Sequence, residues 1–208
     1  MDNGKIKAVI FDLGNVLVDF DHRIAAKRIS KFSDKAPEDI FNLFFDSNLT
    51  ELFEEGKISP QDFFAGVKET LNSPLKYEEF LPIWNEIFFL SEKNRAVYNL
   101  AKSLDKSYKL AMLSNINILH HQYLRDRFPM FDIFPHIITS YEVGARKPKG
   151  QIYKKAIELL GAAPEEVFYT DDRPELVDSA KALGINGFVF RSADQLKKDL
   201  GSAGVTIN

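Results

Sequence analysis

The sequence predicts an α/β protein in which a parallel sheet with helices on both faces is interrupted by an all-helical insert. Two observations favour this fold class. Short apolar runs typical of buried parallel strands alternate with helical patterns, and one stretch of about 70 residues near the N-terminus contains helical patterns alone. The chain of 208 residues, with 45% hydrophobic and 27% charged side chains, has the composition of a globular protein with a substantial core.

The expected strands are short and continuously apolar. A strand buried on both faces of a parallel sheet has this pattern, because neither face meets water. Residues spaced for one helix face follow over 96–104, 152–160 and 176–183. We therefore expect strand–helix–strand units in a doubly wound sheet. The expected strands are Ala8–Phe11, Leu110–Leu113, His136–Thr139, Val167–Tyr169 and Phe188–Phe190.

The segment from about Phe20 to Phe89 is expected to be a helical bundle with an aromatic core. It holds eleven of the eighteen phenylalanines and the only tryptophan. Within it, Ser59 is expected to cap a helix that starts with a proline. Gly56 is expected to end the preceding helix, and Pro82 to break or kink a later one.

The insert enters directly after the first expected strand. We divide the chain into an α/β core domain, residues 1–17 and 91–208, and an inserted helical cap domain, residues 18–90. Ligands of open α/β sheets bind beyond the carboxyl ends of the strands. Because the insert leaves from that same edge, it is placed to cover the site.

Charge and residue content argue against several classes of protein. With 27 basic and 30 acidic side chains, the chain lacks the basic footprint of a nucleic-acid binder and any reason to bind an anionic membrane surface. The lack of cysteine excludes disulfides, thiolate metal sites and cysteine nucleophiles. The first apolar run is too short for a signal peptide, and no run approaches the ~20 residues of a membrane span. We expect a cytoplasmic protein that is a monomer or a homodimer.

Polar residues stand at or just after the expected strand ends and in one later loop. They are Asp12, Ser114, Asn115, Lys147, Asp171 and Asp172. Taken alone, each one is typical of a helix cap, a turn or a solvated loop. The carboxyl ends of parallel strands share one edge of the sheet, however, so these groups can converge there.

The chemistry of this set points to phosphoryl transfer. The Asp12 carboxylate can attack phosphorus, and the adjacent pair Asp171 and Asp172 can bind Mg²⁺, which would offset the repulsion between nucleophile and phosphate. Ser114 and backbone N–H groups at a helix start can donate hydrogen bonds to phosphate oxygens. Lys147 supplies positive charge.

Four segments resemble, in order and spacing, the motifs of the haloacid dehalogenase-like hydrolase superfamily: Phe11–Leu17, Leu113–Asn115, Gly144–Pro148 and Phe168–Arg173. The resemblance spans about residues 7–190. It implies a Rossmann-like core with a helical cap of the first type. The motif order excludes a receiver domain of the two-component type, in which the acidic pair comes first.

The resemblance also implies roles for the motif residues. Asp12 would be the nucleophile, Ser114 a phosphate ligand, Asn115 a phosphate or substrate ligand, and Lys147 the electrostatic stabiliser. The implied Mg²⁺ ligands are Asp12, the backbone carbonyl of Gly14, Asp172, and Asp171 directly or through water.

Gly14 departs from the family pattern. Family phosphatases usually carry a second aspartate at this position, which protonates the leaving group and then activates water, a contribution of roughly 10²–10⁴-fold. Asp19 and Asp21 lie nearby in the sequence, and we interpret them as helix-entry residues. Bacterial sugar-phosphate phosphatases of the glucose-1-phosphate type are similar at Asp12–Asn15 and at Phe53–Ser59, and they are hydrolytic without that aspartate.

We therefore predict an Mg²⁺-dependent phosphatase that hydrolyses a small phosphorylated metabolite, such as a sugar phosphate, through an aspartyl-phosphate. One alternative is a haloacid dehalogenase with the same nucleophile, against which the acidic pair argues. The other is a phosphate-binding module without turnover, against which both the acidic pair and Lys147 argue.

Two further groups are open to interpretation. The adjacent His120 and His121 are expected on a solvated helix face. Glu54, Glu55 and Lys57 flank Gly56 in the insert, either as an ordinary surface loop or as a specificity loop that reaches toward the core.

Overall fold

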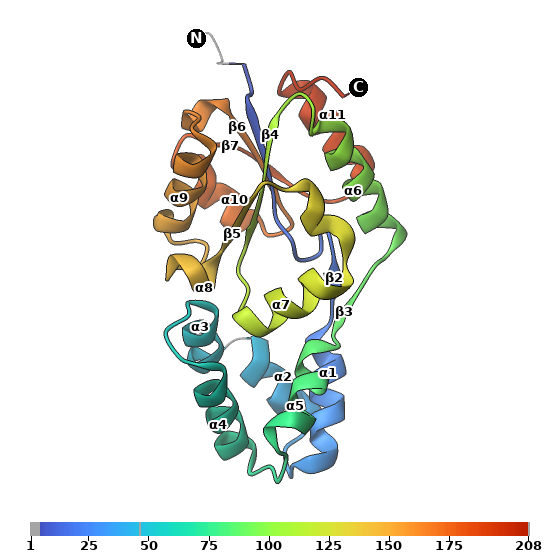
Figure 1. The fold of residues 1–208 in the computed structure, drawn as a ribbon, viewed down its shortest axis with the longest axis vertical. Coiled ribbons are helices and arrows are strands. Elements are labelled where there is room, and N and C mark those ends of the chain that lie inside the picture. Colours follow the sequence, from blue (N-terminus) through green and yellow to red (C-terminus); the bar gives the residue numbers. More distant parts are fainter. Residues whose placement is uncertain (1–4, 46, 208) are drawn as a thin grey trace.

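The computed structural model of the protein describes residues 5–45 and 47–207. Residues 1–4, 46 and 208 of the expected domains therefore lie outside the described residues. An α/β layer structure forms one half of the elongated molecule and a group of helices forms the other, and the first and last described residues lie at the far end of the α/β half (Figure 1).

A five-stranded sheet is the framework of the α/β half. Its strands are β1 Ala8–Phe11, β4 Lys109–Ser114, β5 His136–Thr139, β6 Val167–Asp171 and β7 Asn186–Val189. The strand order is β5-β4-β1-β6-β7, and every neighbouring pair is parallel. Because β1 is central and lies between β4 and β6, the residues at the carboxyl ends of these three strands are neighbours.

Helices cover both faces of this sheet, as the uniformly apolar strands predict. They are α6 Glu92–Leu104, α7 Ile118–Arg127, α8 Ser140–Val143, α9 Gly150–Leu160, α10 Pro174–Lys181 and α11 Ala193–Ser202. Val9 and Phe11 of β1 point into a core shared with α6 and α11, while Ala8 and Ile10 point into a second core shared with α9 and α10. Figure 1 shows these helix pairs on opposite sides of the sheet.

Strand β7 begins two residues before the expected Phe188–Phe190. The glycine ahead of that apolar run is typical of a turn, but Gly187 pairs with Tyr169 within the sheet. A Cβ atom on Gly187 would lie 2.9 Å from Cγ1 of Val177. The glycine is therefore a strand residue that allows α10 to approach the sheet closely.

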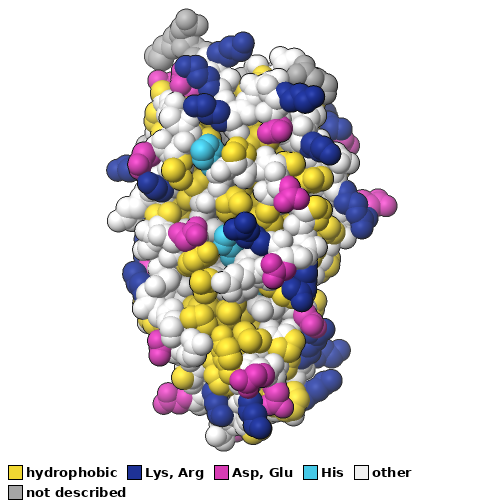
Figure 2. Space-filling model, viewed as in Figure 1, with side chains coloured by type: hydrophobic (Ala, Val, Ile, Leu, Met, Phe, Trp, Pro, Cys, Tyr) yellow, Lys and Arg dark blue, Asp and Glu magenta, His cyan; other side chains and the backbone are white. Residues whose placement is uncertain are grey.

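The other half of the molecule is the expected helical bundle. Its helices are α1 His22–Ile29, α2 Pro37–Phe45, α3 Asn48–Glu54, α4 Pro60–Leu71 and α5 Tyr77–Asn85. Aromatic rings fill its core: the ring centroids of Phe53 and Phe63 are 4.4 Å apart, and those of Phe63 and Trp84 are 4.9 Å apart. In Figure 2, hydrophobic side chains gather over this half, while charges of both signs are scattered over the visible face.

The helix ends follow the sequence signals, with one exception. Ser59 and Asp62 form the predicted capping box at the start of α4, and Gly56, with φ 63°, follows the end of α3. The expectation of a break at Pro82 is wrong, because α5 continues through it to Asn85. Proline removes only the hydrogen bond to the carbonyl of Glu78 there, and the buried side chains of the helix hold it in place.

Two short strands join the halves. Strands β2 Asp19–Phe20 and β3 Phe88–Phe89 pair antiparallel where the chain enters and leaves the helical segment. No strand is expected here from the sequence, since two residues are too few to form a recognisable pattern. The pairing arises because the two chain crossings run side by side.

No helix within the described residues is long and apolar enough to cross a membrane.

Gly56→Ala is expected to destabilise the protein by about 1–3 kcal/mol. Gly56 has a left-handed φ of 63°, and a Cβ there would lie 2.4 Å from the backbone oxygen of Tyr141 in α8. Urea unfolding measures the change. The matched control is Gly201→Ala in α11, where a Cβ meets no atom within 4 Å. The control is expected to be neutral or stabilising, and equal stability of the two variants would contradict the prediction.

Candidate active site

The residues singled out at the strand ends converge on one cavity. Asp12 follows β1, Ser114 ends β4 and Asp171 ends β6, while Lys147 comes from the loop between α8 and α9. All of them, with Gly14, Asn115 and Asp172, line a cavity of about 370 Å³ between the sheet and the helical segment. The predicted convergence is confirmed.

The ammonium group of Lys147 is the centre of this arrangement. Its Nζ atom donates hydrogen bonds to Oδ1 of Asp12 and to Oδ2 of Asp171, both at 2.6 Å, and to the carbonyl oxygen of Leu113 at 3.1 Å. Burial alone would lower the pKa of Lys147, but the two carboxylates outweigh it and hold that pKa above its ordinary value. The lysine is therefore charged, and it links the ends of the three central strands.

Asn115 fixes the backbone of Lys147. Its Oδ1 accepts a hydrogen bond from the Lys147 backbone N–H at 2.7 Å, and its Nδ2 donates to the Lys147 carbonyl at 2.9 Å. Both polar ends of the amide are thus engaged in positioning the lysine. Direct binding of phosphate by Asn115 stays a prediction.

Three carboxyl groups crowd around the lysine. One carboxylate oxygen from each of Asp12, Asp171 and Asp172 lies within 4.8 Å of the corresponding oxygens of the other two. Burial acts to raise the pKa of Asp12, and the Lys147 ammonium group acts to lower it. Burial also raises the pKa of Asp172. For Asp171 the effect of burial is outweighed by Lys147, and its pKa is lowered.

Two residues that hold these carboxylates escaped the sequence analysis. The hydroxyl of Tyr169 donates to Asp171, and Nδ2 of Asn15 donates to Oδ2 of Asp172 at 2.9 Å. The period of two along β6, which puts Tyr169 and Asp171 on one face, is a signal for the first. Asn15 has a left-handed φ of 56° in the turn after Asp12, and nothing in the sequence indicates its distant partner.

The position of the missing second aspartate is occupied by an aromatic ring. A Cβ atom on Gly14 would lie 2.8 Å from Cε1 of Phe20. Neither nearby aspartate replaces the carboxylate. Asp21 caps α1 by accepting from the backbone N–H of Arg23, and Asp19 accepts from Ser91 and from an asparagine of α6. The interpretation as a helix-entry residue is confirmed for Asp21, whereas Asp19 lies in strand β2.

The loop after α3 reaches the core rather than solvent. Glu55 is 4% exposed, and its Oε1 accepts from the backbone N–H of Arg146 at 3.2 Å. It also pairs with Lys149. Glu54 lines the cavity that contains Asp12. The loop thus reaches toward the core, as one of the two interpretations requires, while its role in specificity stays a prediction.

Aromatic side chains of the helical segment and its crossings line the same cavity. Phe44 is fully buried, whereas Phe45 is 51% exposed. His22 also lines the cavity, and its buried Nδ1 has no hydrogen-bond partner among the described residues. The cavity therefore has a charged end at the sheet and a largely apolar end at the helices.

The expectation of a solvated face at His120 and His121 is wrong. His120 stacks on Trp84 with ring centroids 4.6 Å apart, and its Nε2 lies 3.0 Å from the Trp84 carbonyl oxygen. His121 lies 2.9 Å, through Nδ1, from the hydroxyl of Tyr141. Helix α7 lies between the sheet and the helical segment (Figure 1), so it is covered on more than one side.

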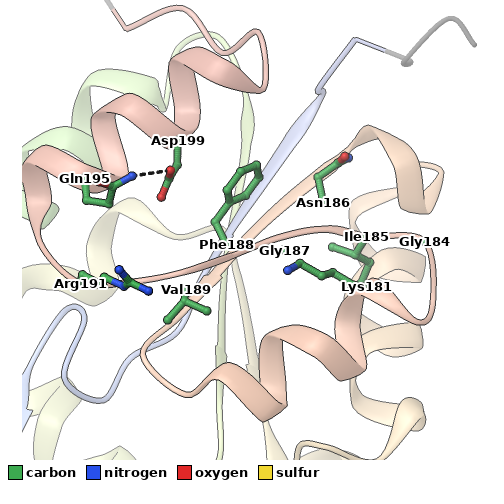
Figure 3. A pocket seen from close by; sticks show the side chains of 10 residues that line it. All are labelled: Lys181, Gly184, Ile185, Asn186, Gly187, Phe188, Val189, Arg191, Gln195 and Asp199. Carbon is green, nitrogen blue, oxygen red and sulfur yellow. Dashed lines mark hydrogen bonds between the residues drawn. The ribbon is translucent and has the colours of Figure 1, made fainter.

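A larger hollow of about 730 Å³ lies elsewhere, outside the edge strand β7. Figure 3 shows Phe188, Arg191 and a hydrogen-bonded pair, Gln195 and Asp199, around it. None of the carboxylates at the strand ends reaches this hollow. The side chains singled out at the strand ends therefore lie in the smaller cavity.

A parallel α/β sheet whose carboxyl edge carries an aspartate after β1, a buried lysine and an acidic pair after β6, in this chain order, fits a haloacid dehalogenase-like protein. The chain belongs to the haloacid dehalogenase-like hydrolase family, whose sequence profile matches residues 6–184. The resemblance drawn from the four motifs is thereby confirmed.

Three relatives illustrate the range of the family. The chain is 25% identical over 201 residues to D-ribitol-5-phosphate phosphatase of Bacteroides thetaiotaomicron, covering 94% of this chain and 97% of that protein. It is 26% identical over 182 residues to a sesquiterpene phosphatase of Aspergillus oryzae, covering 87% and 88%. A family enzyme of Bacteroides thetaiotaomicron in complex with magnesium and inorganic phosphate superposes with a TM-score of 0.79 at 27% identity, covering 90% of this chain and 95% of that one.

Gly14→Asp is expected to destabilise the protein by about 1–3 kcal/mol, because the new side chain must displace the ring of Phe20. Urea unfolding measures this, and Phe20→Ala in the same background should recover part of the loss. A Gly14→Asp variant as stable as the wild type would contradict the packing argument.

Proposed function

We propose that this protein is an Mg²⁺-dependent phosphatase that hydrolyses a small phosphorylated metabolite through a phosphoaspartate at Asp12. The observation that carries the proposal is the shared cavity, in which the Asp12 carboxylate lies beside a buried cation, Lys147, and a further acidic pair. The phosphatases among the relatives support it.

The donor set fits a magnesium ion. Mg²⁺ prefers hard oxygen ligands and takes one or two carboxylates together with water and phosphate oxygens. Three carboxyl groups have oxygens within 4.8 Å of one another, and the one ammonium group among them pairs directly with only Asp12 and Asp171, so the cluster has room for more positive charge. We assign the ion to Asp12, Asp172, the backbone carbonyl of Gly14, and Asp171 directly or through water. When bound, the ion offsets the repulsion between the nucleophile and the phosphoryl group.

Three side chains of the protein have separate roles in the proposed reaction. Lys147 occupies Oδ1 of Asp12, so we assign the attack on phosphorus to Oδ2. The Ser114 hydroxyl lines the cavity and makes no hydrogen bond within the described residues, so it remains free to donate to a phosphate oxygen. Lys147 stabilises the negative charge that develops as the phosphoryl group moves to Asp12.

The proposal also includes the location, the oligomeric state, the domain division and the partner expected from the sequence. The enzyme would act in the cytoplasm, as a monomer or a homodimer, with its helical segment, residues 18–90, serving as a cap domain on the α/β core. Its partner is a small molecule rather than nucleic acid or a membrane.

Asp12→Asn is expected to lower the release of inorganic phosphate by more than about 10³-fold, because an amide is not a competent nucleophile. The assay uses a panel of sugar phosphates and an activated aryl phosphate, with Mg²⁺ or with a chelator. The control is Asp21→Asn, a helix cap outside the cavity. Activity that survives Asp12→Asn or the chelator would contradict the proposal. Turnover of a haloacid instead of any ester would identify a dehalogenase.

A further inference from the structure

Hydrolysis of an unactivated ester requires a proton for the leaving oxygen. Gly14 cannot supply it, and Phe20 fills the space that an acidic side chain at this position would use. Another group in the cavity must therefore hold the proton, or the enzyme is restricted to esters with good leaving groups.

Most titratable side chains in the cavity are unsuitable. Asp12 and Asp171 share the Lys147 ammonium group, and Asp172 belongs to the proposed metal site. The two arginines, Arg146 and Arg173, do not release protons at neutral pH. Burial lowers the pKa of His22 to about 4 and that of His120 to about 3, so both are neutral and are poor acids. Glu54 is the group that remains.

The fold holds Glu54 firmly at the cavity wall. It is the last residue of α3, and the next residue, Glu55, is bound to the core through Arg146 and Lys149. The Glu54 side chain is 20% exposed. Glu54 therefore contributes to the wall of the cavity from the helical segment, whereas the aspartates come from the sheet.

The charges that face Glu54 leave it able to carry a proton. Nη1 of Arg146 lies 3.5 Å from Glu54 and 3.1 Å from Glu51, so one guanidinium serves two carboxylates. Arg173 and Lys147 lie further away and contribute less. Burial raises the pKa of Glu54 more than these cations lower it, and Glu51 raises it as well.

We propose that Glu54 is the general acid and base of this enzyme, an inference that rests on the proposed phosphatase function. In the first step an oxygen of Asp12 forms a bond to phosphorus. The bond from phosphorus to the ester oxygen breaks with its electron pair, and Glu54 gives its proton to that oxygen, releasing the alcohol. In the second step the Glu54 carboxylate takes a proton from water as the water oxygen attacks phosphorus. The bond to Asp12 breaks, leaving inorganic phosphate, the Asp12 carboxylate and protonated Glu54.

The test compares leaving groups in Glu54→Gln, which keeps the size of the side chain. The substrates are 4-nitrophenyl phosphate, whose phenolate departs without a proton, and phenyl phosphate, whose leaving group is more basic. We expect kcat/KM for phenyl phosphate to fall by about 10²–10³-fold and that for 4-nitrophenyl phosphate by less than about 10-fold. Loss of the base in the second step should lower kcat for both substrates to a common value.

The matched control is Glu51→Gln. It removes the other carboxylate that pairs with Arg146, and the Glu51 side chain is exposed. It should change kcat/KM for both substrates equally and by only a few fold. Equal losses for the two substrates in Glu54→Gln, or no loss, would overturn the proposal. If the wild-type enzyme released no phosphate from any ester, the result would contradict the proposed function itself.

Discussion

The buried ammonium group of Lys147 organises the reactive edge of the sheet. It contacts the ends of the three central strands through Leu113, Asp12 and Asp171. Removing one member of such a buried ion pair typically destabilises a protein by about 3–5 kcal/mol, since the partner is left charged and unpaired. Stability and chemistry therefore depend on the same contact, and Asn115 is committed to holding the lysine backbone in place.

The cavity is assembled from two sources with different chemistry. The sheet contributes the charged end, which holds Asp12, Lys147 and the acidic pair, the groups that act on the phosphoryl group in the proposed reaction. The helical segment contributes the apolar end, formed by aromatic rings, and one carboxyl group, Glu54. The loop after α3 is fastened to the core by Glu55, so Glu54 is held in a fixed position relative to the side chains at the strand ends.

The sequence predicted those features that depend on local patterns. Continuous apolar runs located four strands closely, and the polar residues at their ends, such as Asp12 and Asp171, predicted the reactive edge because strand direction alone brings them together. Features that depend on remote contacts escaped prediction. The sequence around Gly187 is typical of a turn, but the close packing of α10 makes this glycine a strand residue. His120 is in a sequence typical of a helix surface, but it is stacked against Trp84. The packing of the Phe20 ring against Gly14 is another contact that the local sequence does not reveal.

Rapid-quench analysis during turnover tests the central claim most directly. The enzyme is mixed with a phosphate ester that carries a radiolabelled phosphoryl group, stopped in acid, digested and mapped by peptide. A covalent intermediate on the nucleophile predicts label on the peptide that contains Asp12, formed and lost at rates at least equal to turnover. Turnover without label on the protein, or label on a different residue, would contradict Asp12 as the nucleophile.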